Sequence, residues 1–147
     1  MGEFWPVPDA LTYLAGSWRV ERSVRDLADG AAGEFSGTTV FGPLEGGGLL
    51  HHESGTFAWQ GVPRPAERTL RFLPGAGRGT ADVRFADGRP FHDLDLTSGR
   101  HTADHPCSAD LYRGEFSVLD EDHWRTVWRV RGPAKDLVLT TDYAREG

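Results

Sequence analysis

Five polar residues occupy positions where the alternation of a β-strand would turn them inward, beside apolar neighbours: Arg22, Glu53, His92, Asp110 and Tyr112. Burying a charged side chain costs several kcal/mol unless the charge is paired. The five groups therefore either satisfy one another or converge on a ligand inside the protein. In the second case a shielded carboxylate and a histidine that titrates near neutral pH could act as general acid and base.

The inward placement of His92 and Asp110 rests on the period of two that strands impose on side chains. His92 follows the turn 87–89 and shares its face with the apolar residues at positions 90, 94 and 96. Asp110 shares its face with Tyr112 and Phe116. We therefore expect His92 in the interior and Asp110 as a buried carboxylate.

A second set of residues is expected to bind a ligand. The two faces of the stretch 48–60 compete, and its aromatic residues at 57 and 59 favour the face that carries His51 and Glu53. The stretch 123–131 alternates most clearly and turns both of its tryptophans inward. The predicted ligand-binding residues are Arg22, His51, Trp124, Trp128 and Tyr143.

One segment, 101–107, carries the residues that could bind a metal ion or supply a reactive thiol. His101, Asp104, His105 and Cys107 supply donor atoms suited to zinc or iron. The i, i+4 spacing of the histidines converges on one ion only in a helix, and Pro106 argues against a helix here. We expect solvated loop histidines, no metal, no other cofactor, and a cysteine that packs as a small buried hydrophobic residue rather than acting as a nucleophile.

Composition narrows the class of protein. The chain has 147 residues, enough for one domain over 1–147, and a net charge of -6 that argues against binding nucleic acid. No stretch approaches the roughly 20 apolar residues of a membrane helix, and no signal peptide is evident. Its single cysteine cannot form an internal disulfide, as is usual in a reducing compartment. We therefore expect a cytoplasmic protein without a membrane partner. The oligomeric state stays open, a homodimer included.

The pattern of apolar residues predicts an all-β fold with one short helix. Asp9 can cap a helix over 8–16, and Gly16 can end it. From Ser17 onward, alternating runs are separated by turns rich in Gly, Pro and Asp, which is typical of an antiparallel barrel of about eight to ten strands. Strands are expected near 17–26, 34–42, 48–60, 67–73, 80–86, 90–97, 107–119, 123–131 and 136–144.

Two sets of motifs carry a resemblance to known families. The motif Gly16-Ser17-Trp18, after a short helix and with Arg145 late in the chain, resembles the lipocalin-like (calycin-type) superfamily, in which a tryptophan at the barrel base stacks under a distant arginine. Four blocks, at 16–22, 88–95, 105–112 and 132–136, resemble a bacterial family of unknown function. The resemblance implies the barrel fold, and it gives no indication of which activity the protein has.

Three functions follow from these observations. The first is binding of a lipophilic or aromatic metabolite inside the barrel, with its polar end near Arg22 and His92. The second is a cofactor-independent isomerase, cyclase or lyase that uses His92, Asp110, Glu53 and Tyr112 for proton transfer. The third is a filled barrel that acts through its surface, for example through the outward row Arg125, Arg129 and Arg131. Small barrels support both of the first two functions, and the fold alone does not choose between them. We favour small-molecule binding, with the enzyme as the alternative.

Overall fold

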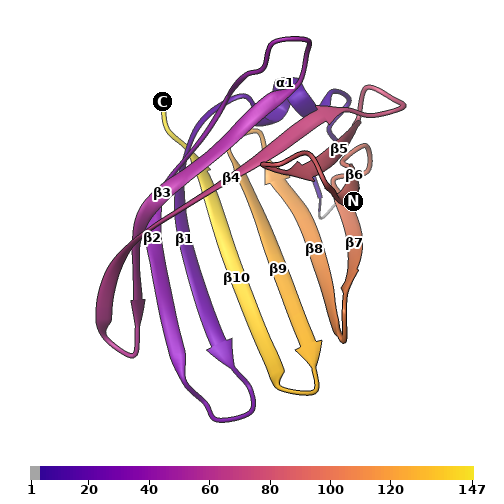
Figure 1. The fold of residues 1–147 in the computed structure, drawn as a ribbon. Coiled ribbons are helices and arrows are strands. Elements are labelled where there is room, and N and C mark those ends of the chain that lie inside the picture. Colours follow the sequence, from indigo (N-terminus) through magenta and orange to yellow (C-terminus); the bar gives the residue numbers. More distant parts are fainter. Residues whose placement is uncertain (1–3) are drawn as a thin grey trace.

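A computed structural model describes residues 4–147 and contains one short helix and ten strands within that range (Figure 1). The elements are α1 (Ala10–Leu14), β1 (Gly16–Asp26), β2 (Ala32–Pro43), β3 (Leu49–Trp59), β4 (Val62–Pro74), β5 (Thr80–Phe85), β6 (Pro90–Asp95), β7 (Arg100–Cys107), β8 (Asp110–Asp120), β9 (His123–Gly132) and β10 (Lys135–Arg145). The all-β prediction is confirmed. No helix among the described residues is long and apolar enough to cross a membrane.

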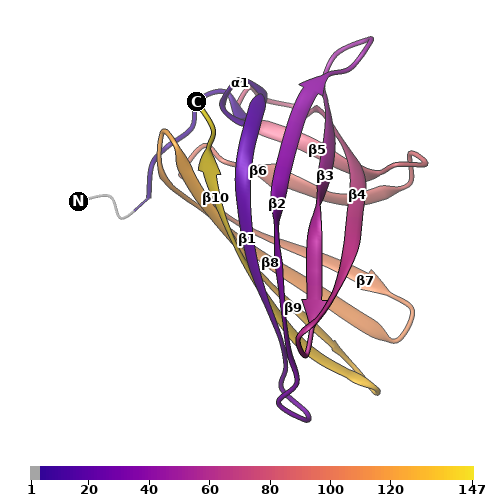
Figure 2. The same ribbon diagram turned by 90° about the vertical axis from the view of Figure 1, so that its left-hand side faces the viewer.

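The ten strands form one antiparallel sheet in the order β6-β5-β4-β3-β2-β1-β10-β9-β8-β7. Pairing of β1 with β10 places the first and last strands side by side, with Trp18 opposite Arg145. The sheet curls until its edge strands β6 and β7 lie against each other, which makes a nearly closed barrel. In Figure 2 the strands β7–β10 cross behind β1–β4, as expected for a strongly twisted barrel.

Side-chain and main-chain bonds close the seam between β6 and β7, which lack a ladder. His101 on β7 donates from Nε2 to the carbonyl oxygen of Asp93 on β6 at 3.0 Å. Near α1, the N-terminal segment bridges the gap, because Trp5 N donates to Val118 O and Val7 N donates to Leu96 O. The seam is thus held at one end by backbone and further along by a histidine.

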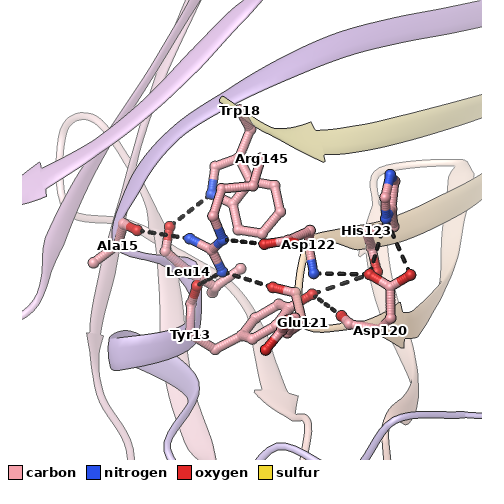
Figure 3. A network of polar contacts seen from close by, with 9 residues as sticks. All are labelled: Tyr13, Leu14, Ala15, Trp18, Asp120, Glu121, Asp122, His123 and Arg145. Carbon is pink, nitrogen blue, oxygen red and sulfur yellow. Dashed lines mark hydrogen bonds and ion pairs between the residues drawn. The ribbon is translucent and has the colours of Figure 1, made fainter. Parts of the chain in front are cut away.

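One end of the barrel is closed by α1 and the residues around Trp18 and Arg145. Asp9 caps α1 by accepting a hydrogen bond from Thr12 N at 3.1 Å. The Arg145 guanidinium lies 4.2 Å from the centre of the Trp18 ring, and Trp18 Nε1 donates to Leu14 O (Figure 3). Arg145 also donates to the carbonyl oxygens of Tyr13 and Glu121. The predicted stacking of a base tryptophan under a distant arginine is confirmed.

The prediction for the segment 100–107 is wrong. It forms strand β7, which pairs with β8 from Arg100 opposite Ser117 to Cys107 opposite Asp110. His101 and His105 share the inward face of this strand with the buried Ala103, so they are half-buried rather than solvated loop residues. Cys107 lies at the exposed β7–β8 hairpin, not in the core. The strand carries few apolar residues, so the pattern of apolar residues did not reveal it.

Candidate functional site

The barrel encloses a cavity of about 120 Å³, part of it open to solvent. Most of its wall is aromatic or aliphatic. The aromatic side chains are Phe72, Phe91, Tyr112, Phe116, Trp124, Trp128 and Tyr143. A mostly apolar, aromatic wall with a few polar groups is typical of the sites that hold small molecules in proteins.

Arg22 and Glu53 form a buried ion pair on the inner surface. Arg22 donates from both terminal nitrogens to the two carboxylate oxygens of Glu53, at 2.9 and 2.8 Å, and from Nε to Thr141 Oγ1 at 2.7 Å. Thr39 donates to the same carboxylate at 3.2 Å. Burial alone would raise the pKa of Glu53, but the bonds from Arg22 outweigh it and hold the pKa at about 2. Glu53 is therefore ionised and neutralised by its partner.

Two buried polar atoms in the cavity wall have no hydrogen-bond partner among the described residues, His51 Nδ1 and Trp124 Nε1. His51 is 2% exposed and packs between Phe41 and Phe72, with ring centroids 5.0 and 5.7 Å away. Trp124 lies flat against Tyr143 at 3.7 Å. An unpaired buried polar group costs about 1–3 kcal/mol, so native proteins leave few of them.

His92 lies in the cavity wall on β6, one of the two strands at the seam. Its Nδ1 lies 2.7 Å from the carbonyl oxygen of Asp93. Because a carbonyl oxygen only accepts, Nδ1 carries the proton and the Nε2 lone pair remains available. Burial lowers the pKa of His92 to about 4, and burial lowers that of His51 to about 3. Both imidazoles are therefore neutral at physiological pH.

Aromatic stacking sets the shape of the wall near His92. Trp128 stacks on Phe91 with ring centroids 5.5 Å apart. The inward position opposite Trp128 on β8 is Gly114, where a Cβ atom would lie 2.5 Å from Cε2 of the indole. The glycine therefore allows Trp128 to lie against β8 instead of filling the cavity.

The structure brings most of the predicted site residues to one cavity. Those in its wall are Arg22, His51, His92, Tyr112, Trp124, Trp128 and Tyr143. Glu53 lies behind Arg22, in a second and more open pocket that also contains Phe35 and Phe57. This pocket shares Arg22 and Arg68 with the cavity, and we refer to it as the wider opening. The prediction of a buried carboxylate at Asp110 is wrong. Asp110 lies on the inward face of β8, but it is the first residue of the strand and stands at the rim of the barrel. There its side chain is half-buried and pairs with Lys135 at 3.3 Å.

Sequence reasoning missed Arg68. It lies on the inner face of β4 with the buried Leu70 and Phe72, and it borders both the cavity and its wider opening. The alternation of these three residues was the signal that could have found it. Its side chain is 49% exposed, and its guanidinium is 4.0 Å from Glu53, beyond hydrogen-bond distance.

This arrangement suits binding better than proton transfer. Glu53 is a weak base because Arg22 holds its ionised form, and Asp110 lies outside the cavity wall. The neutral imidazole of His92 can accept a hydrogen bond, but its low pKa makes it a weak base as well. The cavity otherwise offers aromatic surface and the hydrogen-bonding groups of His51 and Trp124.

The up-and-down antiparallel sheet, the closed end under Arg145 and the aromatic cavity define a lipocalin-like β-barrel, as the motifs predict. Residues 14–145 match a family described as a family of unknown function (DUF6314), and the chain belongs to that family. No curated protein sequence matches the chain.

Several solved structures share the fold. An S-type phycobiliprotein lyase, CPES, from Guillardia theta is 10% identical, with a TM-score of 0.65 over 93% of this chain and 90% of that one. A protein of unknown function from the DUF3598 family of Nostoc punctiforme is 12% identical, with a TM-score of 0.68 over 98% of this chain and 51% of that one. The chain thus spans about half the length of that protein.

A redesigned β-barrel, mFAP1, bound to DFHBI, is 15% identical to the chain, with a TM-score of 0.50 over 92% of this chain and 98% of that one. At these identities the similarities establish the fold and leave the function to the site itself.

Proposed function

We propose that the chain binds a small aromatic or lipophilic molecule inside its barrel. The observation that carries this proposal is the pair of unpartnered buried atoms, His51 Nδ1 and Trp124 Nε1, in the wall of an aromatic cavity. A ligand that accepts a hydrogen bond from the Trp124 indole and packs on the surrounding rings would remove the cost of leaving that donor unpaired.

Two further facts support binding. The walls are built of stacked rings, Trp124 on Tyr143 and Trp128 on Phe91, which hold an aromatic surface in a fixed position before a ligand arrives. A redesigned barrel that shares the fold was solved with the small molecule DFHBI bound. A small barrel can therefore accommodate such a ligand.

The proposal is tested with 2-naphthamide, a neutral aromatic probe that carries a carbonyl acceptor, by isothermal titration calorimetry. We expect saturable binding at one site. Trp124→Phe keeps an aromatic ring but removes the indole N–H, and should weaken binding by about fivefold to tenfold, the worth of one hydrogen bond. The control is Trp5→Phe, because Trp5 is about half exposed near the closed end and outside the cavity wall.

Binding that is unsaturable in the parent protein, or that both substitutions weaken equally, would contradict the proposal. The first result would mean that the cavity does not hold an aromatic molecule. The second would place the bound probe somewhere other than beside Trp124.

A further inference from the structure

The charges around the cavity do not cancel. Arg22 and Arg68 are both in its wall, whereas no Asp or Glu stands among the wall residues that the structure describes. One carboxylate, Glu53, lies directly behind, and Arg22 engages both of its oxygens. On the inner surface two guanidinium groups therefore share one carboxylate, which leaves one positive charge in excess there. The other carboxylate at the wider opening, Glu67, belongs to an exposed position on the opposite face of β4 from Arg68.

Arg68 is the group that carries this excess. Its backbone pairs with Glu53 of the neighbouring strand, yet its guanidinium stays 4.0 Å from that carboxylate because Arg22 occupies both oxygens. Its side chain is half exposed, and its ion pair with Glu53 among the described residues is a long one, so most of its N–H donors remain free. An arginine with free donors can hold a carboxylate by two parallel hydrogen bonds.

The position of Arg68 links the charge to the aromatic walls. On the inner surface, Arg68 is diagonal to His51, because His51 pairs with Leu70, two residues further along β4. His51 is one of the two cavity residues with an unpartnered buried atom. A ligand that reaches both residues must be charged at the opening and able to pack among rings further in.

The two cavity histidines do not change this charge balance. Burial, together with Arg68 in the case of His51, keeps their pKa values near 3 and 4, so both are neutral at pH 7. They neither add to the positive charge nor offset it. His92 can offer its Nε2 acceptor, and His51 its unpartnered Nδ1, to an uncharged part of a ligand.

We propose that the ligand of this barrel is an aromatic anion, with a carboxylate or a similar singly charged acidic group at Arg68 and its ring system among Trp124, Trp128 and Phe116. The inference rests on the proposed function and adds the chemical class of the ligand. A cationic ligand would be repelled by the guanidinium of Arg68, and a neutral one would leave that guanidinium with no charged partner but the distant Glu53 carboxylate. An anion instead completes a second ion pair beside that of Arg22 and Glu53.

The test compares three probes that share one ring system: 2-naphthoate, neutral 2-naphthamide and the cation 2-naphthylmethylammonium. Affinities are measured at pH 7 by isothermal titration calorimetry. For the parent protein we expect 2-naphthoate to bind about tenfold to a hundredfold more tightly than 2-naphthamide, the range for hydrogen bonds to charged groups. The cation should bind most weakly, and added salt should weaken binding of 2-naphthoate in particular.

The variant Arg68→Gln should lower the affinity for 2-naphthoate to that for 2-naphthamide and leave the affinity for the amide unchanged. Arg71→Gln is the matched control. Arg71 is an exposed arginine on the same strand whose side chain points to the opposite face. The Arg71→Gln protein should bind all three probes as the parent does.

The possible failures are separable. Equal binding of 2-naphthoate and 2-naphthamide to the parent would overturn the inference about charge and leave the proposed function standing. Absence of saturable binding for all three probes would overturn both. If Arg68→Gln weakened both probes equally, Arg68 would be shaping the opening of the cavity rather than recognising the anion, and the inference would be wrong.

Discussion

Arg22 on β1 and Glu53 on β3 are joined across the intervening strand β2 by two hydrogen bonds, at 2.9 and 2.8 Å. The Glu53 side chain is 4% exposed and that of Arg22 is 12% exposed, so both charges are largely removed from water. The pair therefore has two roles. It fixes the relative position of three strands, and it also forms part of the polar border of the cavity.

Removing one partner of this pair should destabilise the fold strongly. Glu53→Gln leaves the Arg22 guanidinium buried without a counter-charge, and we expect the free energy of unfolding to fall by about 3–5 kcal/mol. Urea denaturation monitored by circular dichroism measures this loss. Replacing both residues, Arg22→Met with Glu53→Leu, is the control. It should recover much of the stability because no charge remains buried.

A loss below about 1 kcal/mol for Glu53→Gln would contradict this interpretation, since that is the usual worth of a solvated surface pair. The same result would mean that water reaches Arg22 through the opening of the barrel.

Stability should fall on mild acidification because of the cavity histidines. The folded-state pKa values of His51 and His92, about 3 and 4, lie below the ordinary value of 6.5. The unfolded chain therefore takes up protons first, and the stability present above pH 6.5 is lost progressively as the pH falls toward these values. Glu53 adds a further loss as the pH falls from 4.5 toward about 2.

The measurement is the urea midpoint of unfolding from pH 7.5 down to the acid limit of folding. His51→Gln, which cannot titrate, should show a shallower decline below pH 6.5 than the parent, by on the order of a few kcal/mol across the window. Parallel curves for the two proteins would show that the His51 imidazole is protonated as easily in the folded protein as in the unfolded chain.

The sequence was sufficient for the barrel and for most of its inner surface, because alternation is a local property. Trp18 and Arg145 are far apart in the chain, yet the motif around Trp18 predicted their contact. Three features could not be predicted from the sequence, for physical reasons. Strand β7 has little apolar content, and Asp110 faces inward but lies at the rim. The pairing of Arg22 with Glu53 depends on the order of the strands in the sheet.

Gly114 should control the size of the cavity. A methyl group at this position would lie 2.5 Å from the Trp128 indole, so Gly114→Ala should push Trp128 toward the cavity and cost about 1–3 kcal/mol of stability through overpacking. Binding of 2-naphthamide should weaken accordingly. Gly42→Ala is the matched control on β2, because no atom lies within 4 Å of the added methyl group.

Calorimetry with 2-naphthamide measures the change in affinity of the Gly114→Ala protein, and urea denaturation measures the change in its stability. Unchanged affinity in a destabilised Gly114→Ala protein would mean that Trp128 moves away from the cavity, or that the probe does not approach it. Equal effects of the two alanine substitutions would remove the special role of Gly114.

The last prediction concerns His92, the residue that best separates binding from proton transfer. Its Nδ1 donates to Asp93 O, so the Nε2 lone pair is the atom that can accept a hydrogen bond from a ligand. His92→Leu removes this acceptor and keeps an apolar surface beside Phe91. We expect 2-naphthol, which donates a hydroxyl hydrogen, to bind more weakly by about 1–3 kcal/mol, whereas an apolar naphthalene probe keeps its affinity.

His52→Leu is the control for His92, because His52 is an exposed histidine on the outer face of β3. It should alter neither affinity. If His92→Leu bound 2-naphthol as the parent does, Nε2 would not contribute to binding, and attention would move to His51. If instead a reaction of some substrate slowed by about a hundredfold with ligand affinity intact, His92 would be a general acid or base, and the catalytic hypothesis would replace simple binding.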